Sequence, residues 1–147
     1  MRRQSETGER LLATAVGAEG EVAGSREALH LPGHRIPWEQ VETASWSAED
    51  GVLTVVEAGT WGSPRPVHRV ALDRPGRLLE LVRERVTATV LLQRAFAGGR
   101  VVARRAPAGN REVAWFLQYD DAVDPADPAV AEAADAALLA ARAEVGW

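Results

Sequence analysis

The stretch Arg35-Ile36-Pro37-Trp38-Glu39-Gln40-Val41-Glu42-Thr43-Ala44-Ser45-Trp46 decides the fold of this 147-residue chain. It has the pattern of a bent strand, since Pro37 lacks a backbone donor and fits only an edge or a bend. Ile36 and Trp38 put apolar bulk before the bend, and Trp46 ends the segment just before a turn. Because two indole rings this close together are costly to leave in water, we expect a core to close around Trp38 and Trp46.

Short strands are predicted on both sides of this stretch and without an intervening helix. Their ranges are 9–16, 21–25, 26–31, 52–56 and 67–72. The pair Asp50-Gly51 suits a tight turn before the strand at 52–56, because glycine accepts a positive φ. Six short strands at regular spacing are typical of an antiparallel meander that curls into a barrel or a sandwich.

After residue 73 the apolar period changes from two to between three and four, which is typical of a helix. Leu78, Val82, Val86 and Val90 share one face, and Gly98-Gly99 follows. We therefore predict a single long helix over 74–97, placed to cap the barrel.

The remaining residues predict a hairpin and a second helix. Residues 100–105 and 112–119 form the two strands of a hairpin over 100–119, which we expect to pack on the long helix. Asp127 caps a helix over 128–145, with Pro128 in the first position. The expected class is α+β. Residues 1–7 form a disordered tail, 8–97 form the main domain, and 98–147 form an extension packed on it.

The composition limits the chemistry of the chain. The absence of cysteine excludes disulfides, thiolate metal sites and a cysteine nucleophile. The start of the chain is polar and no long apolar run follows, so we expect neither a signal peptide nor a membrane span, and a cytoplasmic location. All seventeen basic residues are arginine, which a GC-rich genome explains without any preference for phosphate.

The charge is unevenly distributed along the sequence. Residues 1–60 carry a net charge of −5, residues 61–119 of +7 and residues 120–147 of −6. Either acidic and basic elements face each other within one domain, or the middle segment offers a basic face to an anionic partner.

No pattern of catalytic residues is present. The chain has no glycine-rich phosphate loop, no serine elbow and no paired catalytic carboxylates, so we assign no catalytic residue, no cofactor and no enzymatic activity. His30 and His34 flank Pro32-Gly33, which rules out the helical metal-ligand geometry. The aspartates of 120–127 lack the alternating ligands and the central glycine of a calcium loop. No metal site is predicted.

The segment Ile36-Pro37-Trp38-Glu39-Gln40-Val41 resembles that of bacterial PH-like domains, in which an aromatic-bearing strand leads through a short helical turn into a further strand. The chain is also similar to small proteins of unknown function from GC-rich bacteria. The resemblance covers about residues 8–97 and implies a barrel capped by one helix. Phosphoinositide-binding members place basic residues in the first strand-to-strand loop. Here Val16–Glu21 holds two carboxylates and no base, which argues against such a ligand.

We therefore expect a non-catalytic, cytoplasmic interaction module that binds a protein partner or itself. Trp61 lies in a Gly/Pro-rich loop and is a candidate anchor for such a partner. The alternative is RNA or single-stranded DNA, bound through an arginine-rich hairpin that carries an aromatic residue. An enzyme or a small-ligand carrier that uses a pocket at the mouth of the barrel is a third hypothesis. The candidate residues on the hairpin are Arg100, Arg104, Arg105, Arg111 and Phe116.

Overall fold

A computed structural model describes residues 8–58, 65–106 and 112–146 of the chain as ten strands, one short 3-10 helix and two α-helices. The predicted tail at 1–7 lies outside these residues. The elements are β1 (Leu11–Gly17), β2 (Gly20–Ser25), β3 (Ala28–Leu31), β4 (His34–Pro37), η1 (Trp38–Gln40), β5 (Val41–Ser47), β6 (Val52–Glu57), β7 (Val67–Asp73), α1 (Arg77–Thr89), β8 (Val90–Phe96), β9 (Gly99–Arg105), β10 (Val113–Tyr119) and α2 (Pro128–Val145).

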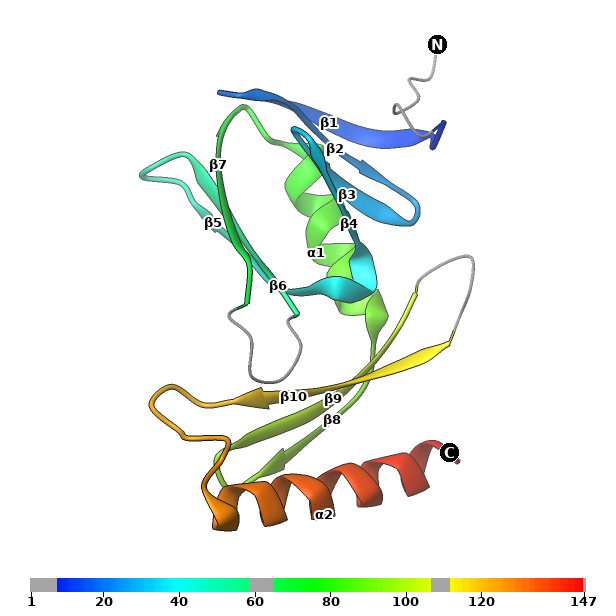
Figure 1. The fold of residues 1–147 in the computed structure, drawn as a ribbon. Helices are drawn as coiled ribbons and strands as arrows, with labels where there is room; N and C mark the ends of the chain where they lie inside the picture. The colour runs from blue at the N-terminus through cyan, green and yellow to red at the C-terminus, as the bar shows by residue number, and fades with distance from the viewer. Residues whose placement is uncertain (1–7, 59–64, 107–111, 147) are drawn as a thin grey trace.

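The first seven strands form one antiparallel sheet in the order β4-β3-β2-β1-β7-β6-β5 (Figure 1). The predicted antiparallel sheet is confirmed, with consecutive strands paired within β1–β4 and within β5–β7, but the prediction of a barrel is wrong because the sheet does not close. The two edge strands, β4 and β5, do not pair with each other. Instead η1 turns the chain from one edge strand to the other, and the sheet stays open. The predicted bent strand is therefore two strands, one on each edge.

The core of this sheet forms around Trp38, as the sequence predicts. Its side chain is fully buried, and its indole nitrogen Nε1 donates to the carbonyl oxygen of Ser25 at 2.9 Å. Trp46 packs against the same core but is only partly buried. A buried indole with its one donor satisfied combines a large apolar contact with no unpaired polar group, which fixes η1 against β2.

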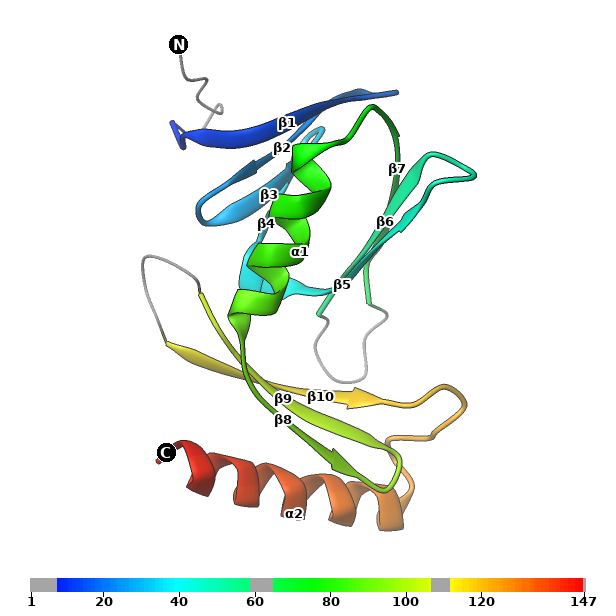
Figure 2. The same ribbon diagram turned by 180° about the vertical axis from the view of Figure 1, so that it is seen from behind.

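Helix α1 packs against this sheet (Figure 2) and is shorter than predicted. It begins at Arg77 and ends at Thr89, so the predicted helix over 74–97 is wrong for residues 74–76 and 90–97. Residues 90–96 form β8, which pairs with β9. Two causes act together: β-branched Val86, Thr87, Thr89 and Val90 disfavour further helix, and strand pairing across Gly98-Gly99 satisfies the backbone instead.

The second sheet has the order β10-β9-β8, and α2 lies along β8 and β9 (Figures 1 and 2). The predicted helix over 128–145 is confirmed, with the Asp127 carboxylate accepting from the Ala129 amide. The predicted hairpin is present as β9–β10, but it packs with α2 and not along α1. Because β8 belongs to this second sheet, the C-terminal unit includes residues that the sequence analysis assigned to the first domain.

Candidate functional site

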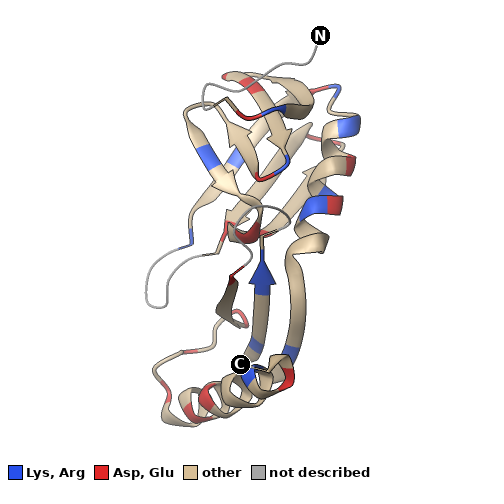
Figure 3. Ribbon diagram, turned by 90° about the vertical axis from the view of Figure 1, so that its right-hand side faces the viewer, with Lys and Arg blue, Asp and Glu red and all other residues tan. Residues whose placement is uncertain are grey.

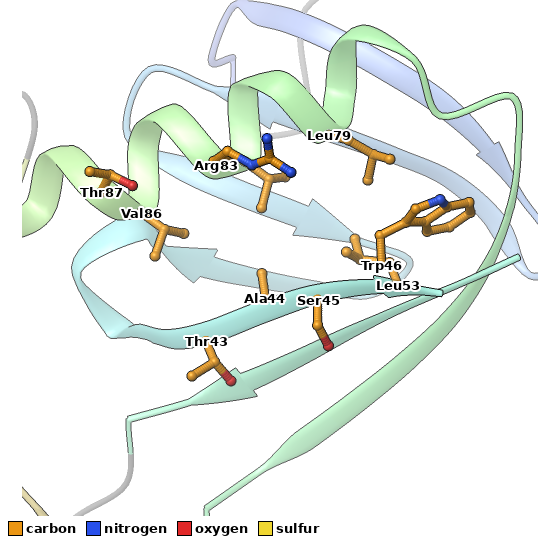
Figure 4. A pocket seen from close by; sticks show the side chains of 10 residues that line it. Thr43, Ala44, Ser45, Trp46, Leu53, Leu79, Arg83, Val86 and Thr87 are labelled. Carbon is orange, nitrogen blue, oxygen red and sulfur yellow. The ribbon is translucent and has the colours of Figure 1, made fainter. Parts of the chain in front are cut away.

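A groove of about 490 Å³ runs between strand β5 and helix α1 (Figure 4). Its floor is apolar and its rim carries hydroxyl groups and one cation. The residues that line it are Thr43, Ala44, Ser45, Trp46, Leu53, Leu79, Val82, Arg83, Val86 and Thr87.

The groove results from two apolar patterns, the alternation of residues on strand β5 and the spacing of three and four residues on helix α1. On β5, Ala44 and Trp46 alternate with the more exposed Thr43 and Ser45, as expected for a strand with one face toward a core. On α1, Leu79, Val82 and Val86 are three and four residues apart and share one face. Among the described residues β5 is an edge strand, so no further strand pairs with it beside this apolar surface.

Arg83 is the single charged residue in the lining of the groove. Figure 4 shows its side chain on α1 above the strand, with Leu79 one turn before it and Thr87 one turn after. Among the residues that the structure describes, no salt bridge is found for Arg83. Along α1 as a whole, basic and acidic positions alternate (Figure 3), so this cation is not part of a uniformly basic face.

A second polar cluster joins Ser25, His30 and Glu9. The Ser25 hydroxyl donates to Glu9 Oε1 at 3.0 Å and lies 3.0 Å from His30 Nε2. Glu9 Oε2 lies 3.6 Å from the same ring nitrogen. In a catalytic triad the carboxylate instead orients the other nitrogen of the ring. Ser25 is also buried and accepts from the Ala28 amide, so this cluster ties the start of β1 to β2 and β3.

His34 and His68, from two strands that are distant in the sheet order, meet at one carboxylate. Glu57 Oε2 lies 3.1 Å from His34 Nε2 and 2.6 Å from His68 Nε2. The two imidazole rings have centroids 4.8 Å apart. Burial works to raise the pKa of the Glu57 carboxyl, but hydrogen bonds from His68 and His34 outweigh it and hold the pKa below its ordinary value.

Of the arginines predicted to bind a partner, the structure describes Arg100, Arg104 and Arg105, and the first two donate to acceptors within the protein. Arg104 is buried, and its Nη1 donates to Thr89 Oγ1 at 3.2 Å. Arg100 Nε donates to Gln118 Oε1 at 2.7 Å. Arg105 and Phe116 are half-buried. Trp61 and Arg111 lie outside the described residues. The nucleic-acid hypothesis therefore has fewer available guanidinium groups in the described part of the chain than the sequence suggests.

Another arginine of the same segment is paired as well. Arg94 donates from Nε and Nη2 to the two carboxylate oxygens of Glu144, at 2.9 and 2.7 Å. This pair links β8 to α2, so the basic middle segment and the acidic C-terminal segment do face each other here. The observation favours the first of the two interpretations of the charge distribution.

No family model, curated protein or solved structure matches this chain. Within residues 8–58, 65–106 and 112–146, neither α1 nor α2 is long and apolar enough to cross a membrane.

Proposed function

We propose that the chain is a PH-like, non-catalytic interaction module that binds an extended peptide segment of a partner protein in the groove between β5 and α1. The observation that carries this proposal is an uncovered edge strand directly beside an apolar groove. An added peptide strand would pair with the backbone of β5 and place alternate side chains on the groove floor. The resemblance to PH-like domains is supported by the strand–3-10–strand order around Trp38 and by one helix packed on the sheet.

The backbone of β5 has the orientation that such pairing needs. The Ser47 carbonyl accepts from the Gly51 amide at 2.8 Å and therefore faces the β6 side. Backbone groups alternate in direction along a strand, so those of Trp46 and Ala44 face away from β6. At the other end, the carbonyl of Glu42 already accepts from Arg104. The open edge thus covers about one short peptide segment, between Glu42 and Ser47.

The lining of the groove specifies the chemistry of the peptide. Trp46, Leu79 and Val86 favour apolar side chains at every second position. Arg83 adds a cation on the helix side, which favours a carboxylate in the peptide at that point. We therefore propose a β-strand-forming segment with alternating apolar residues and one acidic residue, rather than a uniformly charged ligand.

The test begins with selection of peptides from a random display library on the full chain, followed by measurement of their affinity. Binding should protect the Ala44 and Trp46 amides from hydrogen exchange. Leu79→Asp should weaken it by at least about tenfold, because a charge would enter an apolar groove. Leu139→Asp is the matched control, since Leu139 is 73% exposed on α2.

Two outcomes would overturn the proposal. Selected peptides could bind equally well to Leu79→Asp and leave the β5 amides unprotected. The chain could also form a dimer that buries the β5 edge, which sedimentation at increasing concentration would reveal. In that second case the groove binds a copy of the chain itself and not a partner peptide.

A further inference from the structure

We infer that His34, Glu57 and His68 form a binding site for one divalent transition-metal ion. In the described part of the chain, these three side chains come together with their metal-binding atoms facing one another. One such atom from each residue lies within 4.8 Å of the other two. Two imidazoles and one carboxylate form a ligand set of the kind that holds zinc and related first-row ions. The inference is independent of the β5–α1 groove.

All three side chains lie on the inward face of the large sheet. His34 is two residues before the fully buried Ile36 on β4, and Glu57 is two residues after the fully buried Val55 on β6. His68 is four residues before the buried Leu72 on β7. Because alternate residues of a strand share a face, three strands each place a polar residue in line with their buried apolar residues, at the margin of the core.

The sheet geometry brings these positions together. The Glu57 amide donates to the Pro66 carbonyl at 2.9 Å, so His68 is the diagonal neighbour of Glu57 on the adjacent strand. His34 comes from the far edge of the same sheet, whose strand order separates β4 from β7 by three strands. Only the curvature of the sheet makes them meet. A metal ion would therefore link the β4 edge to β6 and β7.

The distances fit a metal ion with little rearrangement. Ligand atoms about 2.0–2.2 Å from a tetrahedral zinc ion lie roughly 3.4 Å from one another. The two distances at Glu57 Oε2 are 3.1 and 2.6 Å, so these two contacts would lengthen slightly on binding. The ligand atoms of the cluster all lie within 4.8 Å of one another, so the two imidazoles would close toward the ion. The ring protons would move to Nδ1 so that each Nε2 presents its lone pair to the ion.

The site is also open on one side. The side chain of His34 is 46% exposed and that of His68 is 26% exposed, while that of Glu57 is 17% exposed. Three protein ligands leave a fourth position for water or for an exogenous group, as in zinc sites that are not purely structural.

Titration of the full chain, prepared without a polyhistidine tag and treated with chelator, tests this inference. Calorimetry with Zn²⁺ should show one ion bound per chain. Loss of a direct ligand should cost more than the roughly 10–100-fold that even outer partners of a metal site contribute. His34→Gln, Glu57→Gln and His68→Gln should therefore each weaken Zn²⁺ binding by at least that factor. His30→Gln removes the third histidine and should leave the affinity unchanged.

A measurement on the unmodified chain guards against variants that fail to fold. Nitrogen NMR of the imidazoles should show that Zn²⁺ shifts the Nε2 resonances of His34 and His68 and leaves those of His30 in place. Co²⁺ should give the visible absorption of a tetrahedral site. Three results would each overturn the inference. The unmodified chain could fail to bind Zn²⁺, the three cluster variants could bind it as tightly as the unmodified chain does, or Zn²⁺ could shift the His30 resonances instead. None of these results depends on peptide binding in the groove.

Discussion

The guanidinium group of Arg104 on β9 donates to the backbone carbonyl oxygen of Glu42 on β5 across 3.2 Å, and so connects the two sheets. The same side chain donates to the Thr89 hydroxyl at the end of α1. Burial lowers the pKa of Arg104, an effect that Glu42 opposes and Arg100 reinforces. One arginine therefore contacts the point where β5, α1 and the second sheet meet.

Replacing this arginine should destabilise the chain. Arg104→Met keeps the length of the side chain but leaves the Thr89 hydroxyl and the Glu42 carbonyl without their donor, a loss of about 1–3 kcal/mol. Removal of a buried charge offsets part of it, so we expect the lower half of that range. Urea unfolding measures the change. Arg105→Met is the control for the adjacent, half-buried position, and an equal loss in both variants would contradict the role of Arg104.

The local elements could be predicted from the sequence because their signals lie within a few residues. Asp127 and Pro128 fix the start of α2, and Asp50-Gly51 marks a turn in which Gly51 has a φ of +67°. The end of α1 could not be predicted in this way. The apolar spacing at Val86 and Val90 continues the helical period, and the β-branched residues weaken the helix without marking where it ends. Pairing with β9 sets that point and makes residues 90–96 a strand.

The clustering of His34, Glu57 and His68 depends on tertiary structure and was missed for that reason. The contact of Glu57 with His68 follows from the β6–β7 register, in which Val55 is opposite His68. The sequence does indicate this contact, because Glu57 and His68 each occupy a position that alternates with the outward-facing residues of β6 and β7. The arrival of His34 depends on the curvature of seven strands, which no local pattern encodes. The β5–α1 groove likewise required the finding that the sheet is open.

Gly99 marks a position where strands β9 and β10 of the second sheet come too close for any side chain. A Cβ atom there would lie 2.2 Å from the Gln118 carbonyl oxygen. Backbone cannot move aside as a side chain can, so Gly99→Ala should cost at least the upper end of the roughly 1–3 kcal/mol typical of overpacking. Thermal unfolding measures this loss.

Gly24→Ala provides the comparison for Gly99. Its Cβ would meet Leu81 Cδ2 at 2.5 Å and Trp38 Cζ2 at 3.3 Å. The end of the Leu81 side chain can rotate away, and the Trp38 contact requires only a small shift. We expect Gly24→Ala to be the milder change. A larger loss for Gly24→Ala than for Gly99→Ala would show that the β9–β10 pair can separate more easily than the core around Leu81 can repack.

The cap of α2 should contribute measurably to stability. Asp127 Oδ1 accepts from the Ala129 amide at 2.9 Å, so Asp127→Ala leaves one helix donor unpaired. The expected loss is about 1 kcal/mol. Asp135→Ala removes the same charge from an exposed position inside the helix and should have little effect. Urea midpoints of the two variants test the difference, and equal midpoints would contradict the capping role.

His30 should make the chain less stable as the pH falls. Burial lowers the pKa of its imidazole below the ordinary value of 6.5, Glu9 acts in the opposite direction, and Arg35 adds to the lowering. The unfolded chain therefore binds a proton more readily than the folded chain. The free energy of unfolding should decline as the pH falls below 6.5, and this decline should stop once the pH passes the lowered pKa.

The variant His30→Gln isolates this contribution from those of the other titrating groups. Glutamine retains an amide that can hydrogen-bond the Ser25 hydroxyl, which His30 Nε2 meets at 3.0 Å, but it does not titrate. The difference in unfolding free energy between the original chain and this variant should be constant above pH 6.5. Below pH 6.5 the original chain should lose stability relative to the variant. Urea unfolding at a series of pH values gives that difference directly. A difference that moves in favour of the original chain on acidification would mean that Glu9, and not burial, controls the protonation of His30.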